Sequence, residues 1–215
     1  MKILIFDFDG TLADTRKAIV SAKQYTMEQM GLEVLDEETC ASTIGLSAKT
    51  GFRKYYPELS EEKLDRCVAI YRKSFEEKIL AEPPVLFPNV KKVLEAIYEK
   101  NIIMTVASAR NRASLTGFLE KLGISGYFGY ILGQEDTSFL KPHPEPVLKT
   151  LERFNIKAED ALVVGDMPMD VEMGKRAGAY ACGVTYGNSE RDILLAAGAD
   201  FVIDDMEELL KLGIF

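Results

Sequence analysis

The fold of this 215-residue chain is decided by residues 2–12, which read KILIFDFDGTL. Four apolar residues, Ile3 to Phe6, run directly into two carboxylates, Asp7 and Asp9, which are followed by a glycine and a hydroxyl. A near-continuous apolar run is typical of a strand buried on both faces of a parallel sheet. Because ligands of open α/β sheets bind beyond the carboxyl ends of such strands, Asp7 and Asp9 are predicted to lie at a functional site.

Two neighbouring carboxylates repel each other unless a cation or a shared proton offsets them. Mg²⁺ suits this kind of site, because it takes few carboxylates and fills its other positions with water and substrate phosphate. The pair Asp7 and Asp9 therefore indicates metal-assisted phosphoryl chemistry, with one acid as nucleophile and the other as acid/base.

The composition is that of an ordinary soluble globular protein, 47% hydrophobic and 28% charged. Lys+Arg 26 against Asp+Glu 34 gives a net charge of −8, with a pI near 4.9. Such a chain lacks the electrostatic footprint of a protein that binds nucleic acid or anionic membrane. Since Asp7 and Asp9 indicate phosphoryl chemistry, we expect a small phosphorylated metabolite as partner. An acidic chain repels such an anion, so its phosphate must be bound by a local cation or by focused dipoles. The oligomeric state, monomer or dimer, is left open.

The cysteines indicate a reducing compartment. Cys40, Cys67 and Cys182 are odd in number, far apart and form no CxxC pair, so we interpret them as buried thiols and not as disulfides or zinc ligands. The apolar run that ends at Asp7 is too short for a signal peptide, and no stretch reaches the length of a membrane span. A cytoplasmic location is expected.

The first part of the chain after Leu12 has only helical patterns. Apolar spacing predicts helices over about 15–30 and 60–80, with short helical pieces on either side of Gly45 and of Gly51. The breakers Pro83 and Pro84 end this region. Residues 15–82 are therefore predicted to form an inserted all-helical cap domain, and residues 1–14 with 83–215 the core domain.

From Asn89 onward, helices and strands alternate. Asn89 is expected to cap the first of these helices. Short apolar strands are predicted at 102–107, 130–132, 161–164, 180–184 and 201–203, with a terminal helix from about Met206. This alternation predicts right-handed βαβ units, hence an α/β fold with a Rossmann-like, doubly wound parallel sheet.

Polar residues follow the predicted strands at the point where each strand ends. Asp7 and Asp9 follow the first strand, Ser108 follows 102–107, and Asp166 follows 161–164. Lys141 lies in the loop after 130–132. Because these ends share one edge of a parallel sheet, the residues are expected to surround one spot.

The physical chemistry of these groups assigns each a role. Asp7 is placed to attack phosphorus, giving an aspartyl-phosphate, and Mg²⁺ held by Asp7 and Asp166 would offset the charge repulsion. Asp9 can protonate the leaving alkoxide and then take a proton from water.

The remaining groups are assigned to the phosphate. Ser108, Lys141 and backbone N–H groups nearby, those of Gly10, Thr11 and Ala109, are expected to hold the phosphoryl oxygens. Asp170, one helical turn from Asp166, is a supporting residue that could hold Lys141 or a metal-bound water.

Each residue also has an ordinary alternative. The Asp7 and Asp9 pair could bind metal without catalysis, Ser108 could cap the next helix, and Lys141 could be a surface lysine. Arg110 could meet a substrate carboxylate, but a solvated position near the helix start is favoured. His143, between two prolines, is interpreted as shaping its loop.

In combination these residues closely resemble the four motifs of the haloacid dehalogenase superfamily. The motifs are Asp7-Phe-Asp9-Gly-Thr-Leu, a strand ending at Ser108, Lys141-Pro, and Gly165-Asp166-x-x-x-Asp170. The resemblance implies Asp7 as nucleophile, Asp9 as acid/base, and Ser108 and Lys141 as phosphate ligands. It also implies Mg²⁺ bound by Asp7, Asp166 and the backbone carbonyl of Asp9.

Within that family the sequence is similar to the phosphoglycolate phosphatases and their pyrophosphatase relatives, through the Lys141-Pro-His-Pro-Glu-Pro run and Thr43-Ile-Gly45-Leu. The resemblance implies a phosphatase, with 2-phosphoglycolate as the best single substrate. The alternatives are an inorganic pyrophosphatase or other phosphatase of the family, a β-phosphoglucomutase-type phosphotransferase, and a non-catalytic binding module.

Overall fold

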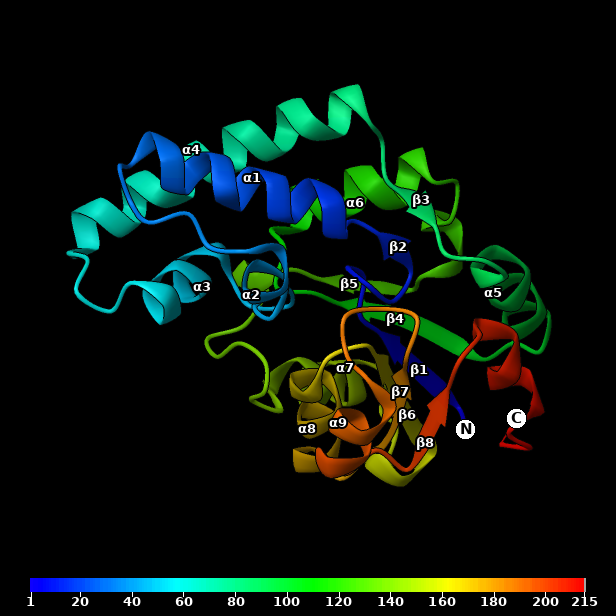
Figure 1. The fold of residues 1–215 in the computed structure, drawn as a ribbon. Coiled ribbons are helices and arrows are strands. Elements are labelled where there is room, and N and C mark those ends of the chain that lie inside the picture. The colour runs from blue at the N-terminus through cyan, green and yellow to red at the C-terminus, as the bar shows by residue number, and fades with distance from the viewer. Residues whose placement is uncertain (215) are drawn as a thin grey trace.

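The computed structural model describes residues 1–214 and shows a six-stranded sheet whose paired strands are all parallel. The strands lie side by side in the order β5 (Tyr130–Leu132), β4 (Ile103–Ala107), β1 (Ile3–Phe6), β6 (Ala161–Gly165), β7 (Tyr180–Val184) and β8 (Phe201–Ile203). β1 is central and completely buried, because its four apolar side chains face a helical layer on each side. The predicted doubly wound α/β sheet is confirmed (Figure 1).

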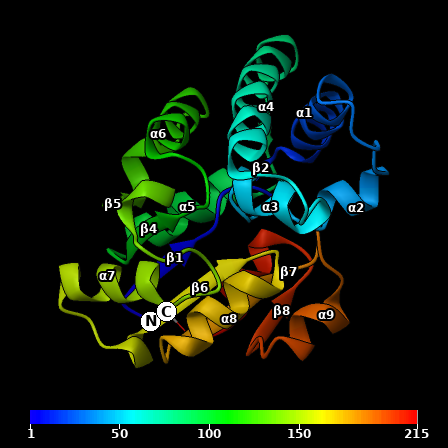
Figure 2. The same cartoon turned by 90° about the vertical axis from the view of Figure 1, so that its left-hand side faces the viewer.

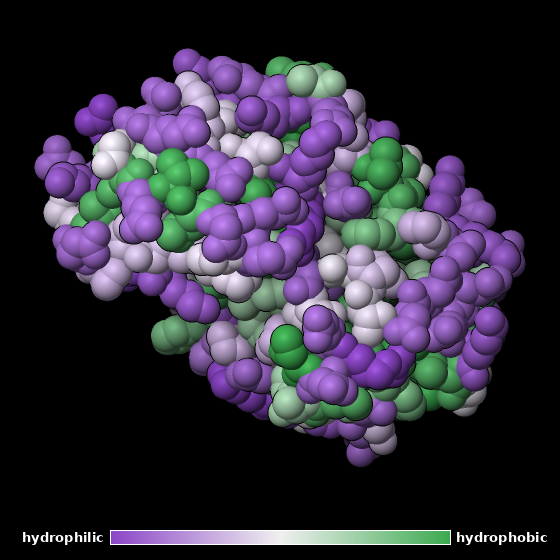
Figure 3. Space-filling view, in the orientation of Figure 1, coloured by the Kyte–Doolittle hydropathy of each residue, from purple (hydrophilic) through white to green (hydrophobic). Residues whose placement is uncertain are grey.

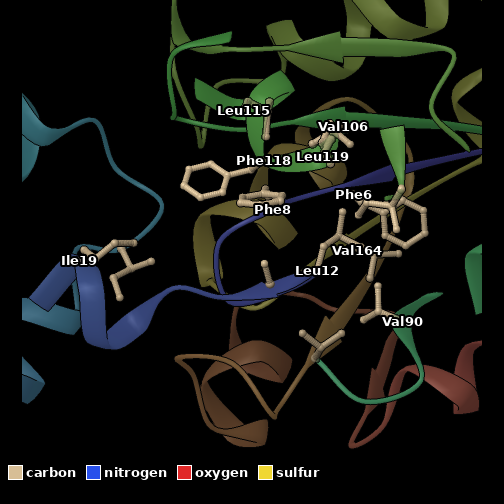
Figure 4. Packing of buried hydrophobic residues seen from close by; sticks show 14 of the residues in the cluster. Phe6, Phe8, Leu12, Ile19, Val90, Val106, Leu115, Phe118, Leu119 and Val164 are labelled. Carbon is tan, nitrogen blue, oxygen red and sulfur yellow. The ribbon is translucent and has the colours of Figure 1, made fainter. Parts of the chain in front are cut away.

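Two layers of helices cover the sheet. On one face, α5 (Val90–Glu99), α6 (Arg112–Lys121) and the 3₁₀ helix η4 (Met206–Lys211) pack on Leu4, Phe6 and Val106. On the other face, α7 (Glu145–Phe154) and α8 (Pro168–Arg176) pack on Ile3 and Ile5, and α9 (Arg191–Ala196) packs against β7 and β8. In Figure 4, Phe6, Val106 and Val164 lie together, and Phe8 lies beside Phe118.

Along the chain, four helices separate the first strand from the rest of the core. They are α1 (Arg16–Gln29), α2 (Glu37–Ala41), α3 (Ala48–Tyr55) and α4 (Glu61–Ala81). α1 and α4 lie side by side above the sheet (Figure 2). The segment leaves and rejoins the core through a short antiparallel ribbon, β2 (Ala13–Asp14) with β3 (Val85–Leu86). All four helices fall within the predicted insertion at 15–82, and the strand pair at its base was not predicted.

Several local predictions differ from the structure. Asn89 does not cap α5 with its side chain: its φ is 62°, and its amide donates to the Asp205 carboxylate at 2.9 and 3.0 Å. Gly51 lies inside α3, and the terminal element after Met206 is a 3₁₀ helix. α9 was not predicted, because six residues are too few to show a helical period.

The three cysteines are buried and unpaired, as predicted. Across residues 1–214, no helix combines the length and the apolar character needed to cross a membrane. The face seen in Figure 3 is covered mostly by hydrophilic side chains, with apolar ones in scattered groups.

Candidate active site

The strand register explains why distant residues meet. Phe6 is level with Val106 of β4 and with Val164 of β6. The chain therefore leaves all three strands at the same height, and Asp7, Ser108 and Asp166 follow within two residues. The predicted gathering of these groups at the carboxyl edge of the sheet is confirmed.

Lys141 reaches the same place from the loop between β5 and α7. Its Nζ lies 2.5 Å from Asp7 Oδ1 and 2.7 Å from Asp170 Oδ1, and all three side chains are almost fully buried. Burial opposes the charged ammonium, but Asp170 and Asp7 outweigh it and raise the pKa of Lys141. The predicted contact between Asp170 and Lys141 is thus observed.

Asp7, Asp166 and Asp170 each offer a carboxylate oxygen within 4.8 Å of the others. Burial raises the pKa of Asp7 well above its usual range, and Lys141 only partly opposes this. Burial and then the neighbouring Asp170 raise the pKa of Asp166. Three buried acids beside one lysine leave an excess of negative charge, which a bound cation would remove.

The donor set fits Mg²⁺. All the available atoms are carboxylate oxygens, the hard ligands that this ion prefers. Among residues 1–214, Asp7 Oδ2 is buried without a hydrogen-bond partner. At Gly10, where φ is +87°, a Cβ would lie 2.2 Å from Asp166 Oδ2, so only glycine leaves room at this oxygen. The Asp170 carboxylate lies with Asp7 and Asp166 where it could also hold the ion, whereas the Asp9 side chain is not part of this cluster.

Asn188 holds Asp166 and was not predicted from the sequence. Its backbone N–H and its side-chain amide donate to Asp166 Oδ2 at 2.8 and 2.7 Å, and Thr11 Oγ1 donates to Oδ1 at 3.3 Å. A Cβ at Gly187 would come within 2.4 Å of the Asp166 Cβ. The only available signal was that Gly187 and Asn188 follow the carboxyl end of a strand.

Asp9 is not part of that cluster and is held by two side chains. Thr15 Oγ1 donates to Asp9 Oδ1 at 2.7 Å. Arg110 Nε donates to Oδ2 at 3.1 Å, and Arg110 Nη2 donates to Oδ1. Neither Thr15 nor Arg110 was predicted to contact this acid.

The favoured prediction of a solvated Arg110 is wrong. Its guanidinium carbon lies 4.6 Å from the ring centre of Phe75 and 4.8 Å from that of Phe118. Burial opposes the charged guanidinium, but Asp9 outweighs it and raises the pKa of Arg110. A buried guanidinium needs a carboxylate, and Asp9 is the partner that no local pattern could reveal.

The other predicted phosphate ligands lie close by. Ser108 is buried, and its Oγ accepts from the backbone N–H of Arg110 at 3.2 Å. Ala109 lines the neighbouring cavity. The backbone N–H groups of Gly10 and Thr11 donate within their own turn, to Ala13 O at 3.0 Å and Phe8 O at 3.4 Å. His143 stacks on Phe139 at 4.4 Å, in agreement with its predicted place in the loop.

A cavity of about 390 Å³ lies between the inserted helices and the core. Asp9, Arg110 and Asn111 line it from the core. Lys23, from α1, and Thr43, from the loop after α2, are among the residues that line it from the helical side. The cavity therefore begins at Asp9 and extends toward the helical segment.

Comparison with known proteins agrees with this architecture. The family model of the haloacid dehalogenase-like hydrolases matches residues 4–184. A phosphoglycolate phosphatase from Aquifex aeolicus is 32% identical over 213 residues, which cover 99% of this chain and 96% of the relative. The pyrophosphatase PpaX of Oceanobacillus iheyensis is 28% identical over 214 residues, 99% of this chain and 96% of the relative.

A solved structure has nearly the same fold. A haloacid dehalogenase-like hydrolase from Bacteroides fragilis superposes with a TM-score of 0.91 at 26% identity, covering 97% of this chain and 99% of that one.

Proposed function

Because this chain belongs to the haloacid dehalogenase-like hydrolases, we propose that it is a phosphatase that hydrolyses a small phosphomonoester through an aspartyl-phosphate on Asp7. Its relatives named phosphoglycolate phosphatase support 2-phosphoglycolate as the first substrate to test. The buried thiols are compatible with the reducing cytoplasm that we propose as its compartment.

The observation that carries the proposal is the hydrogen bonding of the two oxygens of the Asp7 carboxylate. Lys141 Nζ holds Oδ1 at 2.5 Å, while Oδ2 has no hydrogen-bond partner among residues 1–214. A buried oxygen that no group of the protein uses is available to attack phosphorus. The attack forms the bond from Oδ2 to phosphorus and breaks the bond from phosphorus to the leaving oxygen.

Asp9 is the group that we assign to proton transfer. Arg110 and Thr15 fix its carboxylate at the start of the cavity, where the leaving group would lie. In its acid form, Asp9 gives a proton to the leaving alkoxide. The resulting carboxylate then takes a proton from water, whose oxygen bonds to phosphorus while the bond from phosphorus to Asp7 Oδ2 breaks and inorganic phosphate leaves. These two steps return Asp7 and Asp9 to their starting states.

The other residues bind and balance charge. Ser108 and Lys141 hold phosphoryl oxygens at the sheet edge. Asp7, Asp166 and Asp170 would hold Mg²⁺, which when bound supplies positive charge against the phosphate. Asn188 and Thr11 orient Asp166 for that task.

A pyrophosphatase activity is the second candidate, because a relative that is aligned over nearly the whole chain is named a pyrophosphatase. A phosphotransferase of the mutase type stays as an alternative that the choice of assay can separate. Hydrolysis releases inorganic phosphate in steady state, whereas a mutase returns an isomer of its substrate.

The test is release of inorganic phosphate, with Mg²⁺, from 2-phosphoglycolate, pyrophosphate and a panel of metabolite phosphoesters, ranked by kcat/KM. Asp7→Asn should lower kcat by about 10⁴-fold or more, since the nucleophile is lost. Asp192→Asn, an exposed acid in α9, is the matched control and should retain full activity. Absence of phosphate release from every compound, or a fully active Asp7→Asn, would refute the proposal.

A further inference from the structure

Lys23 of α1 is a buried lysine whose observed partners are neutral. Only 4% of the residue is exposed. Its Nζ donates to Cys40 O at 2.7 Å and to Thr43 Oγ1 at 2.6 Å, and the Tyr55 ring centre lies 5.8 Å away. No carboxylate among residues 1–214 forms an ion pair with it. Desolvation by burial lowers the pKa of Lys23 to about 7.

Lys23 lines the same cavity as Asp9, which we assign to proton transfer. The chain carries a net charge of −8, yet five of the cavity's lining residues are Lys or Arg and two are Asp or Glu. An excess of positive charge in an acidic protein attracts anions locally. The ligand of this cavity is therefore expected to carry negative charge of its own.

Two of the other cations of the cavity already have carboxylate partners. Lys49 Nζ lies 2.5 Å from Asp65 and 3.1 Å from Glu61. Arg110 is engaged by Asp9. Lys23 differs from both, because it combines deep burial with neutral acceptors only. Of these three cations, Lys23 is the one whose charge a ligand would have to balance.

A buried ammonium without a counter-ion is costly, and an apolar residue would fill the same space more cheaply. The leaving group of a phosphoester at Asp7 would extend past Asp9 into the cavity that Lys23 lines. We propose that Lys23 binds a second anionic group of the substrate, so that the substrate class is small phosphate esters or anhydrides that also carry a carboxylate or a further phosphate. This inference rests on the proposed phosphatase function.

The test compares substrates that differ only in the second charge. Phosphate release is measured from 2-phosphoglycolate and from 2-amino-2-oxoethyl phosphate, an isostere in which a neutral amide replaces the carboxylate. Pyrophosphate serves as the phosphate-bearing arm. Wild type should prefer an anionic substrate over the isostere. Lys23→Met should lower kcat/KM for that anionic substrate by about 30-fold or more, and change kcat/KM for the isostere by less than about threefold.

Two further variants keep the result interpretable. Lys23→Gln removes the charge but retains a hydrogen-bond donor for Cys40 O and Thr43. It replaces Lys23→Met in the test if the Met variant does not fold. Lys17→Met removes a lysine of the same helix that is 77% exposed and paired with Glu82, and it should leave both substrates unaffected.

The two hypotheses fail in different ways. If wild type releases phosphate but loses the same factor on both substrates in Lys23→Met, the inference about Lys23 is wrong and the phosphatase function stands. If wild type prefers the neutral isostere, the inference is again wrong. If wild type releases phosphate from no compound, the proposed function itself fails. The preferred anionic substrate identifies the second group as carboxylate or phosphate.

Discussion

Lys141 is the residue on which the charge balance of the site depends. It contacts Asp7 and Asp170, and Asp166 lies within the same cluster. Burial keeps water from screening these charges. In the absence of metal, Lys141 is therefore the cation that makes the cluster of acids tolerable, as well as a proposed ligand of the phosphate.

We predict that Lys141→Met lowers the free energy of unfolding by about 3–5 kcal/mol in EDTA, because breaking a buried ion pair leaves uncompensated charge. Mg²⁺ should raise the melting temperature of this variant more than that of wild type, since the cluster becomes more negative. Thermal unfolding with EDTA and with Mg²⁺ measures both effects, and kcat should fall by about 100-fold or more.

Lys2→Met is the control for this prediction, because it removes an exposed lysine paired with Asp160. An exposed pair contributes little to stability, so the melting temperature should barely move. If Lys141→Met were as stable as this control in EDTA, the charge-balance account would be contradicted.

At the scale of elements, the loop between β5 and α7 decides where Lys141 lies. Glu145, in the first turn of α7, accepts from the backbone N–H of Ser138 at 3.0 Å and of Phe139 at 2.8 Å. These hydrogen bonds, that from Ser138 first, lower the pKa of Glu145 to about 2. The ionised carboxylate thus ties the loop to the start of the helix.

Glu145→Ala is predicted to loosen this loop and to lower kcat by about tenfold, because Lys141 is then less well positioned. In wild type the folded-state pKa is depressed, so this stabilisation is present above the unfolded value of 4.5 and is lost as the pH falls toward about 2. NMR titration of the Ser138 and Phe139 amide signals should show that transition, and the variant should lack it.

Glu152→Gln is the control for the loop prediction, since it neutralises an exposed carboxylate of the same helix, α7. It should change neither the amide signals of the loop nor kcat. Amide signals of Ser138 and Phe139 that titrate identically in wild type and in Glu145→Ala would overturn the assignment.

At the scale of the whole molecule, the inserted helices close the cavity by packing on the core. Phe75 of α4 lies 6.2 Å from Phe118 of α6, ring centre to ring centre, and 4.6 Å from the Arg110 guanidinium. Arg110 in turn holds Asp9. The same contacts therefore join the two parts of the molecule and cover the proposed acid/base, as lids do in other enzymes.

Phe75→Ala should reduce the free energy of unfolding by about 3 kcal/mol, through lost burial and an unfilled space. It should also raise KM for the best substrate by about tenfold, because the cavity opens to water beside Asp9. Denaturant unfolding and steady-state kinetics measure the two effects. Leu80→Ala changes a residue of the same helix that is 76% exposed, and a KM increase of equal size there would contradict this role.

Much of the site was predictable because its signals are local. The apolar run before Asp7, the strand before Ser108 and the Gly165-Asp166 turn each mark a strand end within a few residues. Parallel strands then bring their carboxyl ends to one edge by geometry alone. The order of these signals along the chain thus sufficed to predict the sheet and the gathering of acids around Lys141.

What the sequence by itself determined is which chemical groups gather at the sheet edge. Only the tertiary structure decided which charges are paired. Arg110 pairs with Asp9, Asn188 holds Asp166, and Lys23 is buried beside neutral atoms. The physical reason is that helix and strand patterns report on neighbours along the chain. Ion pairing and desolvation depend instead on residues that packing brings together across 17 positions of the sequence, as between Lys23 and Cys40, or 101, as between Asp9 and Arg110.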